Sequence, residues 1–104
     1  MARTKVLNLE NITNVLKEHK EELKAKYGVE EIGVFGSYVR GGQRRTSDVD
    51  ILVEFKPDAK IGLLGFINME NYLSELLGIK VDLVEKSALK PRIGKRILRE
   101  VVPV

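Results

Sequence analysis

Residue types that carry many common chemistries are absent or nearly absent from this sequence of 104 residues. It contains no cysteine, which excludes disulfides, thiolate metal sites and a cysteine nucleophile. Its one histidine, His19, lies far along the chain from the paired acidic residues described below. No Ser-His-Asp arrangement and no histidine metal site can be assembled around a single histidine. We therefore expect no catalytic role for His19.

Long hydrophobic runs are also missing. The longest apolar stretch, residues 61–69, is interrupted by glycines and Asn68, and it is far shorter than the ~20 residues that span a bilayer. The first residues lack the apolar core of a signal peptide. These absences favour a cytoplasmic protein without a membrane association.

Aromatic residues are few: three Phe, three Tyr and no Trp. We expect the following five in the core or at its margin: Phe35, Phe55, Phe66, Tyr27 and Tyr72. That leaves Tyr38 as the one aromatic side chain near a site. The net charge of +3 is a mild excess, and the basic residues form no continuous stripe. Because a nucleic-acid channel needs basic and stacking groups together, we do not expect nucleic acid as a partner.

The composition fits one small domain. Hydrophobic residues make up 43% and charged residues 32% of the chain, which suits a globular fold with a modest core. The length falls at the lower end of the ~100–150 residues most common for domains. We found no internal repeat, and we expect residues 1–104 to form a single domain.

Hydrophobic patterning predicts alternating helices and strands. The predicted helices cover residues 9–26, 61–77 and 91–100, the strands cover 29–35, 48–55 and 79–84, and a helical turn covers 38–41. Asn8 is a suitable cap for the first helix, and Gly28 is a suitable stop. The order predicts an α/β (α+β) fold, a small mixed sheet with helices packed on it.

Two predicted helices have apolar residues at helical spacing. In the helix 61–77 they lie mostly on one broad face: Leu63, Leu64, Ile67, Met69, Tyr72, Leu73, Leu76 and Leu77. In the last helix we expect four to face inward: Ile93, Ile97, Leu98 and Val101. The last helix also carries a basic face of Arg92, Lys95, Arg96 and Arg99. We interpret that face as solvated, with an acidic partner as the alternative.

Two aspartates, Asp48 and Asp50, stand at the start of the second predicted strand. Because side chains alternate across a strand, both carboxylates point to one face, while Val49 points to the core. Like charges this close are unfavourable for folding. They suit a divalent cation such as Mg²⁺, which prefers oxygen ligands and often keeps substrate phosphates in its shell.

Gly36 and Ser37 form a turn at the end of the first predicted strand. Glycine lets main-chain N–H groups approach a phosphate, and the serine hydroxyl can donate to a phosphate oxygen. The helical turn that follows would direct its positive N-terminal end at the same place. A metal on one strand and a phosphate cradle on the adjacent turn indicate a nucleoside-triphosphate site.

The third predicted strand contributes another carboxylate, Asp82, to an otherwise apolar segment. A lone aspartate there costs free energy unless it is paired or bound to a metal. Given Asp48 and Asp50, we favour a metal role, because two-metal sites need a further carboxylate. Glu54 shares their side of the strand but lies about 13 Å beyond Asp50. We expect it to be exposed or ion-paired.

The pattern Gly-Ser, ten residues, Asp-x-Asp resembles the nucleotidyltransferase superfamily of the DNA polymerase β type. The position of Ser47 before the first aspartate, and of Arg40-Gly41 in the loop, resembles its minimal members, the antitoxins partnered with HEPN-domain toxins. The resemblance covers nearly the whole chain, and it implies a nucleotidyltransferase fold.

The resemblance also implies roles for individual residues. Asp48 and Asp50 would bind two Mg²⁺ ions, and Asp82 would complete the metal site. Gly36 and Ser37 would hold the β- and γ-phosphates of ATP.

Arg40 and Ser47 are further candidates for nucleotide binding. The arginines of this loop, Arg40, Arg44 and Arg45, are each within reach of triphosphate oxygens, and the resemblance favours Arg40. Ser47 has a structural alternative, because its hydroxyl can bond a main-chain group at the entry to the strand.

The implied reaction is attack of a hydroxyl on the α-phosphate of ATP, with release of pyrophosphate and transfer of AMP to the acceptor. A chain this short has no separate domain for a nucleic-acid primer, so we expect a protein acceptor. The resemblance makes it a tyrosine of a HEPN-domain toxin, with this chain as the antitoxin of a type VII-like pair and a hetero-oligomer as its assembly. Two alternatives remain: neutralisation of the partner by contact alone, and transfer to a small molecule or an RNA end.

Overall fold

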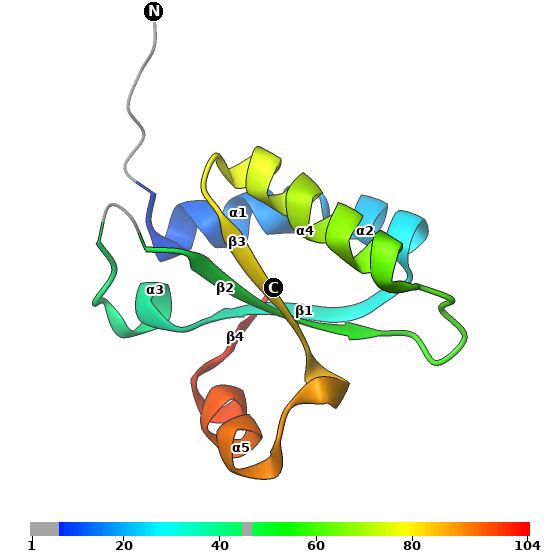
Figure 1. Ribbon diagram of the computed structural model, residues 1–104. Helices are drawn as coiled ribbons and strands as arrows, with labels where there is room; N and C mark the ends of the chain where they lie inside the picture. The colour runs from blue at the N-terminus through cyan, green and yellow to red at the C-terminus, as the bar shows by residue number, and fades with distance from the viewer. Residues whose placement is uncertain (1–6, 45–46) are drawn as a thin grey trace, which may run out of the picture.

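Four strands form one mixed sheet, and helices lie on both of its faces (Figure 1). The strand order is β3-β2-β1-β4, and the computed structural model describes residues 7–44 and 47–104. The elements are α1 (Leu9–Glu18), α2 (Lys20–Tyr27), β1 (Val29–Phe35), α3 (Ser37–Arg40), β2 (Val49–Phe55), α4 (Leu63–Leu77), β3 (Val81–Glu85), the 3-10 helix η1 (Lys86–Ala88), α5 (Pro91–Glu100) and β4 (Val102–Pro103). The predicted α/β architecture is confirmed.

The strand pairing brings the two predicted motifs together. β1 runs antiparallel to β2, with Phe35 opposite Asp50, so the Gly36 turn begins beside the aspartates. β2 runs parallel to β3, and Asp50 is the partner of Asp82 in that register. A parallel pair needs a crossover connection, and α4 supplies it. Residues far apart in the sequence therefore meet at one end of the sheet.

The core lies between one face of the sheet and the helices α1, α2 and α4, which Figure 1 shows side by side above it. The helices contribute the fully buried Ile12, Leu16, Leu23, Met69 and Leu73, and β2 contributes Val49, Ile51 and Val53. This confirms that the residues alternating with the aspartates point inward. The five aromatic residues predicted for the core or its margin are all buried or half-buried there or at the sheet.

The predicted helix 9–26 is two helices, because the chain breaks at His19. The His19 main-chain N–H is shared between the carbonyl oxygens of Val15 and Leu16, each at 3.2 Å. Its ring Nδ1 donates to the same Val15 oxygen at 2.9 Å. Asn8 caps α1 as predicted, and Gly28 ends α2 with a φ of 73°.

The second long helix begins later than predicted, and its first residues are exposed. α4 begins at Leu63 rather than at residue 61, and Leu63 and Leu64 are 75% and 77% exposed. Phe66, the fourth residue of α4, does contact the sheet, because its ring centroid lies 6.4 Å from that of Phe55 at the end of β2. None of the helices in residues 7–44 and 47–104 is long and apolar enough to cross a membrane.

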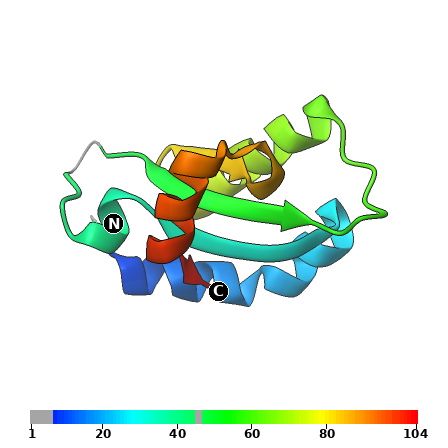
Figure 2. The ribbon, with the colours of Figure 1, turned by 90° about the horizontal axis from the view of Figure 1, so that it is seen from below.

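The inward face predicted for the last helix is also wrong in part. Ile93 and Leu98 are 53% and 47% exposed, and Gly94 is the residue of α5 that is buried. A Cβ on Gly94 would lie 3.3 Å from Leu89 Cβ. α5 crosses the second face of the sheet with only the short helix η1 beside it among the described residues (Figure 2).

The end of the chain forms an edge strand that the sequence analysis described only as extended. β4 pairs antiparallel with β1, with Val102 opposite Val34 and Pro103 opposite Gly33. A Cβ on Gly33 would come within 2.7 Å of Val101 Cγ2 and 2.9 Å of the Val102 oxygen. This close approach requires glycine, and it fixes the end of α5 near the start of α3.

Candidate functional site

Three aspartates gather on the sheet face that carries α5. Asp50 is half-buried in β2 and is paired in register with the exposed Asp82 of β3. Asp48, also exposed, precedes Asp50 by two positions and therefore shares its side of the chain. The structure thus brings together the carboxylates that were predicted to act together.

Burial and the neighbouring negative charges disfavour ionisation of Asp50. Burial and then the negative charges of Asp82 and Asp48 raise the pKa of Asp50, and Glu100 adds to the rise. The positive charge of Arg40 acts in the opposite direction but does not reverse the shift. A cation would relieve this repulsion, and carboxylate oxygens are the ligands that Mg²⁺ prefers.

The three carboxylates do not form a finished metal cage. Within residues 7–44 and 47–104, no three acidic or histidine side chains are close enough to hold one ion together. The donor chemistry of the aspartates nevertheless fits Mg²⁺, which commonly takes one or two carboxylates and completes its shell with substrate phosphates and water. A bound triphosphate would supply those remaining oxygens.

The Gly36 turn packs directly against Asp50. Gly36 has a φ of 86°, a conformation that side chains disfavour. A Cβ at this position would overlap Asp50 Oδ2 and lie 2.9 Å from Asp50 Cγ. Both constraints require glycine. Ser37, half-buried, follows as the first residue of α3, which starts one residue earlier than the predicted turn.

A further acidic residue, Glu100, contacts this turn, and the sequence analysis did not single it out. The Gly36 N–H donates to Glu100 Oε2 at 2.7 Å. Arg40 Nη1 donates to Glu100 Oε1 at 2.8 Å and to Oε2 at 3.0 Å. Burial opposes ionisation of Glu100, but the hydrogen bonds from Gly36 and Arg40 and the charges of Arg40 and Arg96 outweigh it, so its pKa is lowered.

Arg40 therefore lies at the site, held by a carboxylate, and its side chain is 56% exposed. A sequence signal for Glu100 existed. It is an acidic residue at the C-terminal end of a basic helix, where the helix dipole disfavours negative charge.

Ser47, another candidate in this loop, has a structural contact with Arg44. Ser47 Oγ accepts a hydrogen bond from the Arg44 N–H at 2.7 Å, and the Ser47 N–H donates to the Arg44 oxygen at 3.0 Å. Ser47 thus closes the loop before β2, the structural alternative considered above. Arg45 lies outside the described residues. Glu54 is ion-paired as predicted, with Lys86 Nζ 3.5 Å from its Oε1.

Tyr38, predicted near the site, is buried rather than available for stacking. Its side chain is part of the core cluster, and it is 5% exposed. Burial and the negative charge of Asp48 raise the pKa of Tyr38. Tyr38 therefore anchors α3 beneath the site.

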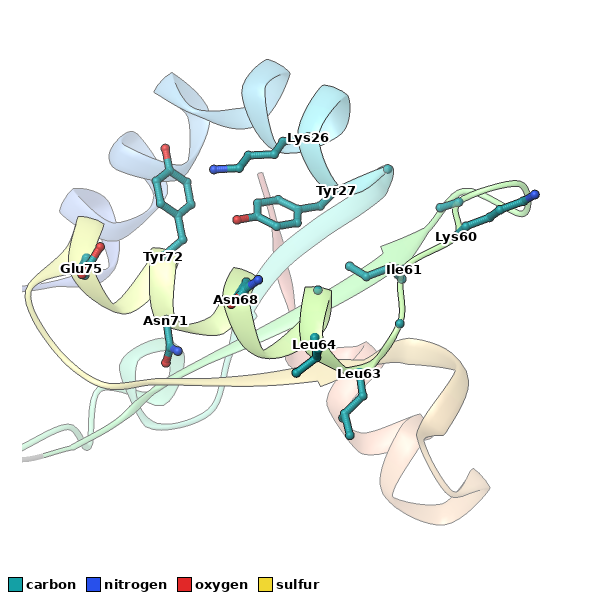
Figure 3. A pocket seen from close by; sticks show the side chains of 14 residues that line it. Lys26, Tyr27, Lys60, Ile61, Leu63, Leu64, Asn68, Asn71, Tyr72 and Glu75 are labelled. Atoms are coloured by element: carbon teal, nitrogen blue, oxygen red, sulfur yellow. The ribbon is translucent and has the colours of Figure 1, made fainter.

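A hollow of about 980 Å³ lies elsewhere, formed by the end of α2, the segment before α4, and α4 itself. Figure 3 shows Lys26 and Tyr27 close to Tyr72 in its lining, which includes none of the candidate site residues. A smaller hollow of about 220 Å³ lies between the sheet and α5, with Leu52 and Leu98 in its lining. The candidate site lies instead at one end of the sheet, beside the end of α5.

Most of the chain matches a known protein family and a named relative. Residues 16–104 match the nucleotidyltransferase domain family. The protein adenylyltransferase MntA of Thermococcus cleftensis is 57% identical over 99 residues, which cover 95% of this chain and 98% of that protein.

Solved structures give the same result for the fold. A structure described as a minimal nucleotidyltransferase matches with a TM-score of 0.78 and 35% identity, over 97% of this chain and 100% of that one. A toxin–antitoxin structure with AMP-PNP matches with a TM-score of 0.67 over 93% of this chain and 72% of that one. Its identity of 24% supports a shared fold alone.

Proposed function

From the premise that this chain belongs to the nucleotidyltransferase domain family, we propose that it transfers AMP from ATP to a hydroxyl of a protein partner. The membership agrees with the resemblance carried by the Gly-Ser and Asp-x-Asp motifs. A protein adenylyltransferase that is 57% identical over nearly the full length of both chains supports this choice of reaction.

One observation carries the proposal: the Gly36 turn packs on Asp50, and Asp50 is paired with Asp82. The groups that we propose to bind phosphate and metal are thereby adjacent at one end of the sheet. A site that activates a triphosphate needs both, because charge must be neutralised where the phosphate is transferred.

Each candidate residue then has a role in the transfer. Gly36 and Ser37 bind the β- and γ-phosphates, and Arg40 adds a positive charge beside them. Mg²⁺ held by Asp48 and Asp50 would neutralise the triphosphate and lower the pKa of the acceptor hydroxyl.

Asp82 completes the carboxylate set from the neighbouring strand, where it can accept the proton of the acceptor. The acceptor oxygen forms a bond to the α-phosphorus, the bond to the β-phosphate oxygen breaks, and pyrophosphate leaves. The exposure of Asp48 and Asp82 at this end of the sheet suits the reaction, because a protein hydroxyl must reach the α-phosphate from outside.

We further propose that the acceptor is a tyrosine of a HEPN-domain toxin and that this chain is its antitoxin. A fold neighbour from Shewanella oneidensis is an MNT antitoxin in complex with a tri-AMPylated HEPN toxin. Its 17% identity supports the fold, so the partner assignment depends on the motif resemblance as well.

The test uses the chain co-purified with the HEPN-domain protein encoded beside it. With Mg²⁺ and ATP labelled at the α-phosphate, the label should appear in the partner band, and the partner's mass should rise by whole AMP units. Asp50→Asn should abolish labelling. Glu54→Gln is the matched control, because Glu54 lies on the same strand but is paired with Lys86.

Two results would contradict the proposal. Label in RNA or in a small molecule, with an unchanged partner mass, would favour the transfer alternative. Full neutralisation of the partner by Asp50→Asn would favour neutralisation by contact.

A further inference from the structure

The carboxylate of Glu100 occupies donors that the proposed function assigns to the nucleotide. It accepts from the Gly36 N–H at 2.7 Å and from Arg40 Nη1 at 2.8 and 3.0 Å. A main-chain N–H has a single hydrogen, so Gly36 cannot bond fully to Glu100 and to a phosphate oxygen at once. A carboxylate and a phosphate both present acceptor oxygens to such donors, so the two compete for one place.

We propose that Glu100 is an internal competitor of the nucleotide: its carboxylate holds the Gly36 N–H and Arg40 until a triphosphate displaces it. The inference rests on the proposed function in one respect, that this turn binds the phosphates of ATP. It adds a residue outside the Gly-Ser and Asp-x-Asp motifs that sets nucleotide affinity.

The surroundings of Glu100 are unfavourable for a negative charge apart from these donors. Glu100 is the last residue of α5, where the helix dipole places its negative end. Its charge also acts on Asp50, which already lies beside Asp48 and Asp82. The Gly36 N–H and the positive charges of Arg40 and Arg96 offset these unfavourable effects on Glu100. When a triphosphate takes the donors, the field of the aspartates favours departure of Glu100.

The surroundings of the Glu100 side chain permit that departure. Ile93 and Leu98 are 53% and 47% exposed, so this face of the molecule is only partly covered. β4, which follows shortly after Glu100, pairs with β1 and holds the end of α5 in place. Figure 2 shows α5 lying across the face of the sheet opposite α1 and α2. Rotation of the side chain can thus release the Gly36 turn without disturbing the core on the opposite face.

A permanent scaffold is the competing explanation. In that case Glu100 keeps Arg40 and the turn in place while the nucleotide binds, and its removal weakens binding. The two explanations predict affinity changes of opposite sign, which makes them separable by direct measurement.

The experiment measures binding of Mg²⁺–ATP and of tripolyphosphate by calorimetry to the full chain. Glu100→Ala removes the competitor, and we expect binding on the order of tenfold tighter. Glu100→Gln keeps an acceptor oxygen but loses the charge, so a smaller gain is expected. Glu75→Gln is the control: it removes the same charge from an exposed position of α4, on the opposite face of the sheet, and should leave affinity unchanged.

Each outcome decides the question. Weaker binding by Glu100→Ala than by wild type, or equal binding, would overturn the inference while leaving AMP transfer intact. No binding of either probe to any variant would overturn both the inference and the proposed function. Tighter tripolyphosphate binding without AMP transfer to any partner would support the inference and contradict the proposed function. Should Glu100→Ala fail to fold, the isosteric Glu100→Gln still gives the sign.

Discussion

The two faces of the sheet differ in almost every physical property. On one face, α1, α2 and α4 bury side chains such as Ile12 and Leu73 completely. On the other, α5 and the short helix η1 leave Ile93 and Leu98 about half exposed. The carboxylates of Asp50 and Glu100 lie on this second face and are only partly buried. Apolar contacts dominate the first face, and unbalanced charges dominate the second.

This difference indicates a separation of tasks between the two faces of the sheet. The closed face supplies most of the apolar burial that stabilises the fold. The open face keeps the aspartates close together at a cost in free energy, which is common where charges serve a function. Substitutions on the two faces should therefore have different effects on folding and on activity.

The largest effect on stability is expected on the closed face. Leu73→Ala removes a fully buried side chain of α4 and should lower the free energy of unfolding by about 2–5 kcal/mol. Leu64→Ala in the same helix is the control, because Leu64 is 77% exposed, and it should change stability by less than about 0.5 kcal/mol. Urea unfolding measures both. Similar losses at the two positions would disprove the contrast between the faces.

Gly36→Ala should affect both folding and chemistry. The new Cβ would overlap Asp50, and the alanine would have to adopt a φ of 86°, so the turn has to shift. We expect a loss of about 1–3 kcal/mol in stability, and transfer of AMP should fall by about 10²–10³-fold. Gly42→Ala is the matched loop control, since a Cβ there meets nothing within 4 Å. Unimpaired transfer by Gly36→Ala would show that the turn need not approach Asp50.

Asp50→Asn should stabilise the protein at neutral pH. The pKa of Asp50 is raised by burial and by Asp82 and Asp48, so the folded state holds the proton more tightly than the unfolded state does. Stability therefore falls as the pH rises through the window between the ordinary and the raised pKa. The advantage of Asp50→Asn over wild type should be present at pH 7 and should shrink toward pH 4. Chemical unfolding across this range measures it, and a pH-independent difference would contradict the account.

Glu100→Gln should show the opposite sign and a smaller effect. The pKa of Glu100 is lowered, because the hydrogen bonds from Gly36 and Arg40 and the charges of Arg40 and Arg96 outweigh the effect of burial. Its ionised form therefore contributes stability above the ordinary pKa, and this contribution is lost as the pH falls through the lowered value. The variant should be slightly less stable than wild type at pH 7 and equal to it in acid. Chemical unfolding across the same pH range measures this difference. A gain in stability of Glu100→Gln at neutral pH would show that Glu100 is not stabilised by its donors.

The parts of the fold and site that the sequence predicted are those encoded by neighbouring residues. Alternation assigns Asp48 and Asp50 to one side of a strand and Val49 to the other. The Gly-Ser turn follows an apolar strand directly, so its position beside the aspartates needed only a pairing of neighbouring strands. These features depend on a period or a spacing within a few residues.

The features that the sequence did not predict depend on which surfaces remain uncovered. Apolar periodicity in α4 and α5 does not reveal that Leu64 and Leu98 are exposed. The contact of Glu100 with Gly36 spans 64 positions and depends on the edge strand β4, which is too short to show any period.

The central claim is that the open face binds a nucleotide through its aspartates, and thermal unfolding with and without Mg²⁺–ATP tests it most directly. At a free nucleotide concentration 100 times the Kd, binding should stabilise the wild type by about 2.7 kcal/mol. Asp50→Asn should lose most of that gain, whereas Glu54→Gln, which removes the charge paired with Lys86 on the same strand, should retain it. An equal rise in the Tm of Asp50→Asn and wild type would show that Asp50 takes no part in binding and would contradict the account.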